Sequence, residues 1–136
     1  MPAVSRKNKT EKLSMKEEDY LEAIQNSILD KGYARCKDVA ESLDVSPSSV
    51  TEMFSKLSKK DLVIYRKYEG VTLTESGKFI ANQIIDRHDT LVSFLKILGV
   101  PDKIAEKDGC FMEHELDKIT IDKIKQFVKS SNKNKY

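Results

Sequence analysis

Hydrophobic positions in the first half of the chain recur at helical spacing in three stretches. The first follows Ser14, which has a glutamate three residues later in the pattern of a capping box, and it ends before Gly32. The second covers about residues 36–42. The third begins at Ser46-Pro47, because a hydroxyl at the N-cap and a proline at the first helical position both favour a helix start. The short connection between the second and third stretches predicts a helix-turn-helix.

The pattern then changes to β-branched runs on either side of residues 66–70, which predicts a hairpin with a basic tip. A long helix is predicted from Thr74 to Gly99. It carries more apolar positions than one helix face needs, which favours a dimer interface. Two further helices are predicted, one near 104–116 and one after Thr120.

This order of elements predicts a mainly α protein. A winged helix-turn-helix DNA-binding domain is expected at 14–81, and an all-α metal-binding and dimerisation domain at 82–130. Residues 1–13 are expected to form a disordered basic arm, and residues 131–136 a frayed tail.

Charge is strongly segregated, although the formal net charge of +2 looks nearly neutral. Residues 55–70 carry five basic and two acidic side chains, and residues 123–135 carry five lysines and no acid. Residues 101–117, in contrast, carry two basic and six acidic side chains. Solvated helix faces could produce this pattern. The alternative is two kinds of partner, a polyanion and a cation.

Several classes of protein are disfavoured by the composition. The chain has no apolar run long enough to span a membrane and no apolar leader, so we expect a cytoplasmic protein without a membrane partner. Its two cysteines, Cys36 and Cys110, are expected to be reduced thiols. Five glycines without a phosphate-loop pattern argue against a nucleotide-dependent enzyme.

The helix that starts at Ser46 is the candidate DNA-recognition helix, because its exposed positions are mostly small hydroxyls near a helix N-terminus. Side chains of the predicted hairpin tip add positive charge for phosphate contacts. Few side chains on this helix can read bases by paired hydrogen bonds, so shape readout is expected. A winged helix used for protein contacts is the alternative. The candidate DNA-binding residues are Arg35, Ser46, Pro47, Ser48, Ser49, Thr51, Glu52, Lys56, Arg66, Lys67 and Tyr68.

A second set of residues has the types and spacing of a metal site. Three members stand at i, i+3 and i+4 and would share one side of a helix, and two carboxylates stand at i and i+3 in the first helix. A mixture of carboxylate, imidazole and thiolate suits Fe²⁺ or Mn²⁺ better than calcium or magnesium, and it would also bind Co²⁺, Zn²⁺, Ni²⁺ or Cd²⁺ in vitro. Solvated acids and a packing cysteine are the alternative. The candidate ligands are Asp19, Glu22, His88, Cys110, Glu113 and His114; Cys36 is expected only to pack.

Several motifs in the same order resemble the diphtheria toxin repressor family, and within it the short branch of manganese transport regulators. The resemblance covers about residues 15–128. The motifs are Glu18-Asp19-Tyr20-Leu21-Glu22, Lys31-Gly32-Tyr33-Ala34-Arg35, Ser46-Pro47-Ser48-Ser49-Val50-Thr51, Leu73-Thr74 with Gly77, Arg87-His88 and Glu113-His114.

The resemblance implies a cytoplasmic homodimer that binds double-stranded operator DNA when Mn²⁺ or Fe²⁺ is bound and that represses genes of metal uptake. Our hypothesis is that metal links the first helix to the dimerisation domain. Asp19, Glu22, His88 and the Glu113-His114 pair match the manganese branch, whereas Cys110 matches the cysteine of the iron-responsive branch. The chain therefore combines a hard and a soft ligand. The C-terminal SH3-like domain of the longer iron repressors is expected to be absent.

Two other functions remain open from the residues. A winged-helix regulator could sense a small organic ligand without any metal. A metalloenzyme could use Glu113 as a general base, although no open catalytic ligand set is evident and the winged helix would then lack a role. We therefore expect a regulator and not an enzyme.

Overall fold

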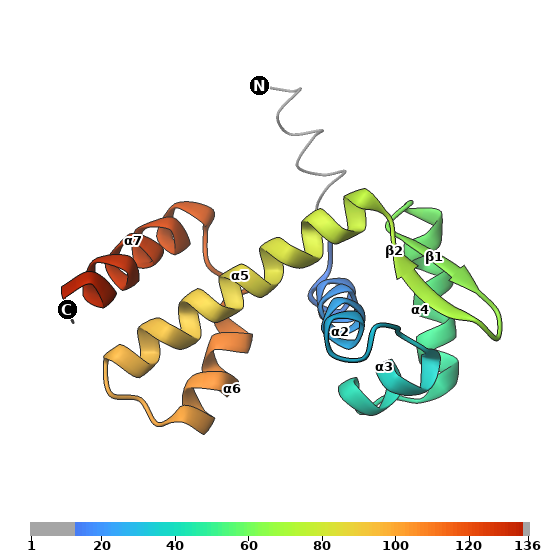
Figure 1. Cartoon of the computed structure of the whole chain (residues 1–136), viewed down its shortest axis with the longest axis horizontal. Helices are drawn as coiled ribbons and strands as arrows, with labels where there is room; N and C mark the ends of the chain where they lie inside the picture. Colours follow the sequence, from blue (N-terminus) through green and yellow to red (C-terminus); the bar gives the residue numbers. More distant parts are fainter. Residues whose placement is uncertain (1–12, 135–136) are drawn as a thin grey trace, which may run out of the picture. The chain divides into compact units, whose positions relative to one another are not determined.

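The computed structural model describes residues 13–134 (Figure 1). The chain forms two compact units, with the boundary between Ala81 and Asn82. Unit 1 is a winged helix-turn-helix and unit 2 is helical, which confirms the predicted fold class. In chain order the elements are α2 (Met15–Lys31), α3 (Cys36–Leu43), α4 (Pro47–Lys59), β1 (Val63–Arg66), β2 (Gly70–Leu73), α5 (Glu75–Ile97), α6 (Asp102–Met112) and α7 (Lys118–Asn134).

Local capping signals set the bounds of the first helices. Ser14 accepts the backbone N–H of Glu17, and Glu17 in turn accepts the backbone N–H of Ser14, so the capping box is present. Gly32 ends α2 in the left-handed region at φ 88°. Ser46 caps α4 and Pro47 occupies its first turn, as the sequence predicted.

The core of unit 1 lies between α2, α3, α4 and the hairpin. Phe54 of α4 is completely buried, and the centre of its ring lies 5.3 Å from the centre of the Tyr65 ring on β1. This contact packs the hairpin against α4. Other fully buried apolar residues of the unit include Leu21, Ile24, Val39, Val50, Leu57, Val63 and Val71.

The wing is an antiparallel pair in which Val63 stands opposite Leu73 and Arg66 opposite Gly70. Ala34 adds an isolated bridge to β2, where its carbonyl accepts the N–H of Val71 at 2.9 Å. Gly70 has φ 114°, and a Cβ there would lie 2.6 Å from the carbonyl oxygen of Ala34. Glycine is therefore required at the place where the wing meets the loop after α2.

Unit 2 packs the second half of α5 against α6 and α7. Gly109 of α6 lies so close to Val92 of α5 that a Cβ would come within 2.7 Å of its methyl group. Phe94 of α5 and Phe127 of α7 make an edge-on ring contact at 5.8 Å. No helix among residues 13–134 combines the length and the apolar character that a membrane crossing needs.

Three predicted helix bounds in unit 2 are wrong. Helix α6 ends at Met112 instead of reaching residue 116, and the chain continues in a turn in which the Glu115 N–H donates to the Met112 carbonyl, three residues back, in the tighter 3₁₀ pattern. Helix α7 begins at Lys118, before Thr120, and it continues to Asn134 into the expected tail. The remainder of the tail, 135–136, and most of the expected basic arm, 1–12, lie outside the described residues.

The first turn of α5 supplies a stability prediction for unit 1. The hydroxyl of Thr74 accepts the N–H of Gly77 at 3.0 Å and donates to the Asp61 carbonyl at 2.8 Å, and a Cβ on Gly77 would lie 1.9 Å from the Leu62 carbonyl oxygen. Gly77→Ala should therefore destabilise the protein by about 2 kcal/mol, because overpacking displaces backbone.

Urea unfolding followed by circular dichroism measures this effect. The exposed neighbour Lys78 provides the control, since Lys78→Ala adds no atom against Leu62 and should leave the midpoint near that of the wild type. An unchanged midpoint for Gly77→Ala would contradict the close approach of α5 to the Leu62 backbone.

Candidate metal centre and nucleic-acid interface

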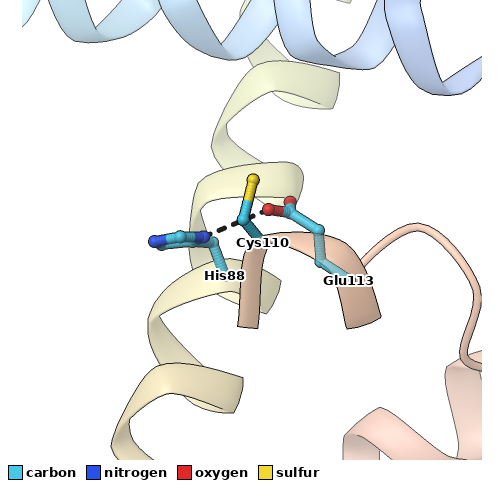
Figure 2. Close-up of side chains that lie close together, drawn as sticks. All are labelled: His88, Cys110 and Glu113. Carbon is cyan, nitrogen blue, oxygen red and sulfur yellow. Dashed lines mark hydrogen bonds and ion pairs between the residues drawn. The ribbon is translucent and has the colours of Figure 1, made fainter. Parts of the chain in front are cut away.

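Three candidate metal ligands meet in unit 2. His88 comes from α5, Cys110 from the last turn of α6, and Glu113 from the C-cap of the same helix (Figure 2). One ligand atom of each lies within 4.8 Å of the others. A nitrogen, a sulfur and an oxygen donor at this separation can bind one transition-metal ion after small side-chain rotations.

The imidazole of His88 faces a carboxylate on each side. Its Nδ1 lies 3.1 Å from Oε1 of Glu113, and its Nε2 lies 3.1 Å from Oε1 of Glu106. A neutral imidazole carries one N–H, so it can donate to only one of these carboxylates and turns a lone pair toward the other. The repulsion between that lone pair and the carboxylate is removed if the ring nitrogen gains a proton or if a cation binds between the two groups.

Glu113 fits a cation for an independent reason. The residue is 1% exposed, and within the described part of the chain its Oε2 atom has no hydrogen-bond partner. A buried carboxylate oxygen without a partner is costly, because the protein does not replace the hydration that the charge had in water. A metal ion bound beside His88 would supply the missing partner.

The structure also shows how the end of α6 places its ligands. Cys110, Glu113 and His114 were expected on one helical face, but the helix ends at Met112. Glu113 keeps a helical position because its N–H still donates to the Gly109 carbonyl at 3.1 Å. His114 falls in the turn that follows and is not one of the three gathered residues.

The remaining candidate ligands, Asp19 and Glu22, lie on α2 in unit 1, where both are partly exposed. The structure therefore brings together three of the six sequence candidates, all of them in unit 2. Cys36 donates to the Pro47 carbonyl at 3.5 Å, and burial raises the pKa of its thiol. A thiol that is harder to ionise is a poorer metal ligand, which agrees with a packing role.

Glu106 was missed by the sequence reasoning, although a signal for it was available. It stands four residues before Cys110 and seven before Glu113, so a helix places all three on one side. Its contact with Nε2 of His88 gives the ring a carboxylate of the kind that commonly orients a metal-ligating histidine.

The N-terminus of α4 presents a cluster of exposed hydroxyls. Ser46 accepts the N–H of Ser49 at 3.2 Å, and the hydroxyls of Ser48 and Ser49 lie 3.2 and 2.9 Å from that of Ser46. The Thr51 hydroxyl donates to the Pro47 carbonyl at 3.0 Å. These side chains are held by local hydrogen bonds and face solvent beside the positive end of the helix dipole, where a phosphate is favoured.

The wing carries an exposed aromatic and basic tip. Tyr68 is 92% exposed and adopts φ 71°, in a turn closed by a 3.0 Å hydrogen bond from the Glu69 N–H to the Arg66 carbonyl. The ammonium of Lys67 lies 5.4 Å from the centre of the Tyr68 ring. The predicted residues Arg35 and Glu52 are exposed as well.

Lys56 has a contact that the sequence did not reveal. Its ammonium lies 3.8 Å from Oε2 of Glu17, and that of Lys60 lies 2.5 Å from the same oxygen. Burial raises the pKa of the Glu17 carboxyl, but the hydrogen bonds from Lys60 and the Ser14 N–H and the charges of both lysines outweigh it, so the pKa lies below its ordinary value. Glu17 is therefore ionised at neutral pH.

Comparison with known proteins agrees with both units. Residues 12–71 match the family described as iron dependent repressor, N-terminal DNA binding domain. Residues 74–136 match the family described as iron dependent repressor, metal binding and dimerisation domain.

Similar individual proteins include the HTH-type transcriptional regulator MntR of Shouchella clausii, 44% identical over 86% of this chain and 82% of that protein. The MntR of Bacillus subtilis is 46% identical over 82% of this chain and 78% of that protein. Among solved structures, the manganese regulator SloR superposes with a TM-score of 0.72 at 26% identity, over 83% of this chain and 53% of SloR, so the chain spans about half of that protein. The chain belongs to the diphtheria toxin repressor, or iron-dependent repressor, family of transcriptional regulators.

Proposed function

We propose that the protein is a metal-dependent transcriptional repressor that binds operator DNA as a cytoplasmic homodimer and senses Mn²⁺ or Fe²⁺ to control genes of metal uptake. The observation that carries the proposal is the buried Glu113 carboxylate, gathered with His88 and Cys110 in a chain that also holds a winged helix. Its similarity to MntR and to the manganese regulator SloR supports manganese as the main ion.

The proposed metal ligands are His88, Cys110 and Glu113, joined by His114, Asp19 and Glu22. A bound divalent ion supplies positive charge that neutralises the carboxylates of this set. Thiolate from Cys110 favours softer ions, while Asp19 and Glu22 favour manganese, so the mixed set would accept Fe²⁺ as well as Mn²⁺. Co²⁺, Zn²⁺, Ni²⁺ and Cd²⁺ are expected to bind in vitro. Asp19 and Glu22 belong to the DNA-binding unit, so an ion that they help to hold would make that unit sensitive to the metal.

The proposed DNA contacts divide into two kinds. Hydroxyls at the start of α4 reach base edges and phosphates in the major groove, and the basic wing tip contacts the backbone.

Each recognition helix would read one half of a two-fold operator, and therefore a dimer is needed. Exposed large apolar side chains in unit 2 give a second copy of the chain a surface to bury, and they include Leu98, Ile104, Phe111, Ile119 and Phe127.

DNA binding measured with and without metal tests the proposal. Fluorescence anisotropy with a labelled operator should show affinity rising by about 10- to 100-fold when Mn²⁺ replaces chelator, the usual range of such coupling. Glu113→Gln should abolish most of that gain, because the amide cannot offset the ion's charge. The control Asp89→Asn removes an exposed acid next to His88 and should respond like the wild type. Equal affinity with and without Mn²⁺ and Fe²⁺ would refute the proposal.

The thiolate ligand has a spectroscopic signature of its own. Anaerobic titration with Co²⁺ should produce a near-ultraviolet thiolate-to-cobalt absorption band in the wild type, because an ionised sulfur donates charge to the metal. Cys110→Ala should abolish the band. Cys36→Ala is the matched control and should keep it, since Cys36 lies in unit 1 against the Pro47 carbonyl. A band that persists without Cys110, or that is lost without Cys36, would remove Cys110 from the ligand set.

A further inference from the structure

One buried charge in unit 1 belongs neither to the proposed metal ligands nor to the DNA-facing surface. Glu17 is 2% exposed at the start of α2. Its Oε1 accepts the Ser14 N–H at 2.8 Å, and its Oε2 lies 2.5 Å from Nζ of Lys60 and 3.8 Å from Nζ of Lys56. Both oxygens of the carboxylate are therefore used, one to cap α2 and one to bind α4.

The two lysines stand at the C-terminal end of the recognition helix. Lys56 is in the last turn of α4 and Lys60 is its C-cap residue, 43 positions from Glu17 in sequence. Their side chains are exposed, but the carboxylate that they share is buried, so water and salt screen this contact less than an ion pair between two exposed groups. A charged hydrogen bond of this kind is directional, whereas the apolar contacts of Phe54 and Leu57 nearby are not.

The same two helices face each other farther along α2. A groove of about 390 Å³ is lined by Asp19 and Tyr20 of α2 on one side and by Ser49, Glu52 and Lys56 of α4 on the other. Asp19 is a proposed metal ligand, and Ser49 and Glu52 are candidate DNA contacts. The helix that would hold the ion thus lies beside the helix that would read DNA, and Glu17 joins their ends.

We propose that Glu17 is a positioning residue that ties α4 to α2, so that fixing α2 through Asp19 and Glu22 also fixes the recognition helix. The inference rests on the proposed function. Coupling between two ligand sites requires a physical connection whose arrangement both sites influence, and this ion pair is one that can be removed alone. Without it, α4 would keep its apolar packing but lose the directional restraint at its C-terminal end.

The substitution Glu17→Gln separates the ion pair from the helix cap. A glutamine at this position still accepts the Ser14 N–H in a capping box, but it has no charge for the lysines. Lys60→Gln removes the partner instead. Lys59→Gln is the matched control, since Lys59 is an exposed neighbour on the same helix with no ion pair among the described residues.

Three quantities are measured for each variant and for the double variant Glu17→Gln/Lys60→Gln: operator affinity with and without Mn²⁺, Mn²⁺ affinity of the free protein, and the urea midpoint. The gain in operator affinity caused by Mn²⁺ should fall about tenfold in both single variants, within the usual range of coupling. The double variant should lose no more than Glu17→Gln alone, because Glu17→Gln already removes the charge that Lys60 contacts. The Mn²⁺ affinity of each variant without DNA should equal that of the wild type. The Lys59→Gln control should match the wild type in all three quantities.

The outcomes separate this inference from the proposed function. Variants that unfold at lower urea but keep the full gain from Mn²⁺ would show that the pair only stabilises unit 1, and the inference would be wrong. Additive losses in the double variant would also overturn it. A wild type without any gain from Mn²⁺ would instead overturn the proposed function and, with it, the inference.

Discussion

Burial of the Glu113 carboxylate is the constraint on which the candidate site depends. Helix α6 ends just before this residue, and the close packing of Gly109 against Val92 brings that end of the helix to α5. The carboxylate is then removed from water beside an imidazole whose second nitrogen already faces Glu106. Two carboxylates thus flank one imidazole, and a cation in place of the missing partner would lower the free energy of the folded unit.

Metal binding would also change the net charge of the protein, and with it the attraction to DNA. The formal net charge of +2 arises from basic and acidic segments that nearly cancel. A divalent ion held by the acidic set makes the protein more positive, so association with a polyanion becomes more favourable at low salt. This contribution does not depend on any movement of the chain.

Local signals in the sequence were enough to predict most of the fold. The capping box at Ser14 and the Ser46-Pro47 pair fixed the starts of α2 and α4, because their causes lie within four residues. The end of α6 could not be read in this way. The apolar and acidic pattern continues past Met112, but the helix gives way there to a turn in which the Glu115 N–H donates to the Met112 carbonyl.

Contacts between distant residues were the part that the sequence could not supply. The i, i+3 spacing of Cys110 and Glu113 indicated a site, but their meeting with His88 depends on how α5 packs on α6. Glu17 was identified only as a helix-capping residue, because nothing local marks Lys60 as its partner. Helical spacing would have revealed Glu106, whereas the pairing of Glu17 with Lys60 required the tertiary structure.

Calorimetric titration of Mn²⁺ into the free protein and into the same protein bound to its operator tests the central claim most directly. If the ion that fills the Glu113 site increases the affinity for DNA, bound DNA must increase the affinity for the ion by the same factor, because coupling between two ligands is reciprocal. The Mn²⁺ dissociation constant should therefore be lower in the DNA complex by that factor. Equal Mn²⁺ affinity for the free and DNA-bound protein would contradict it.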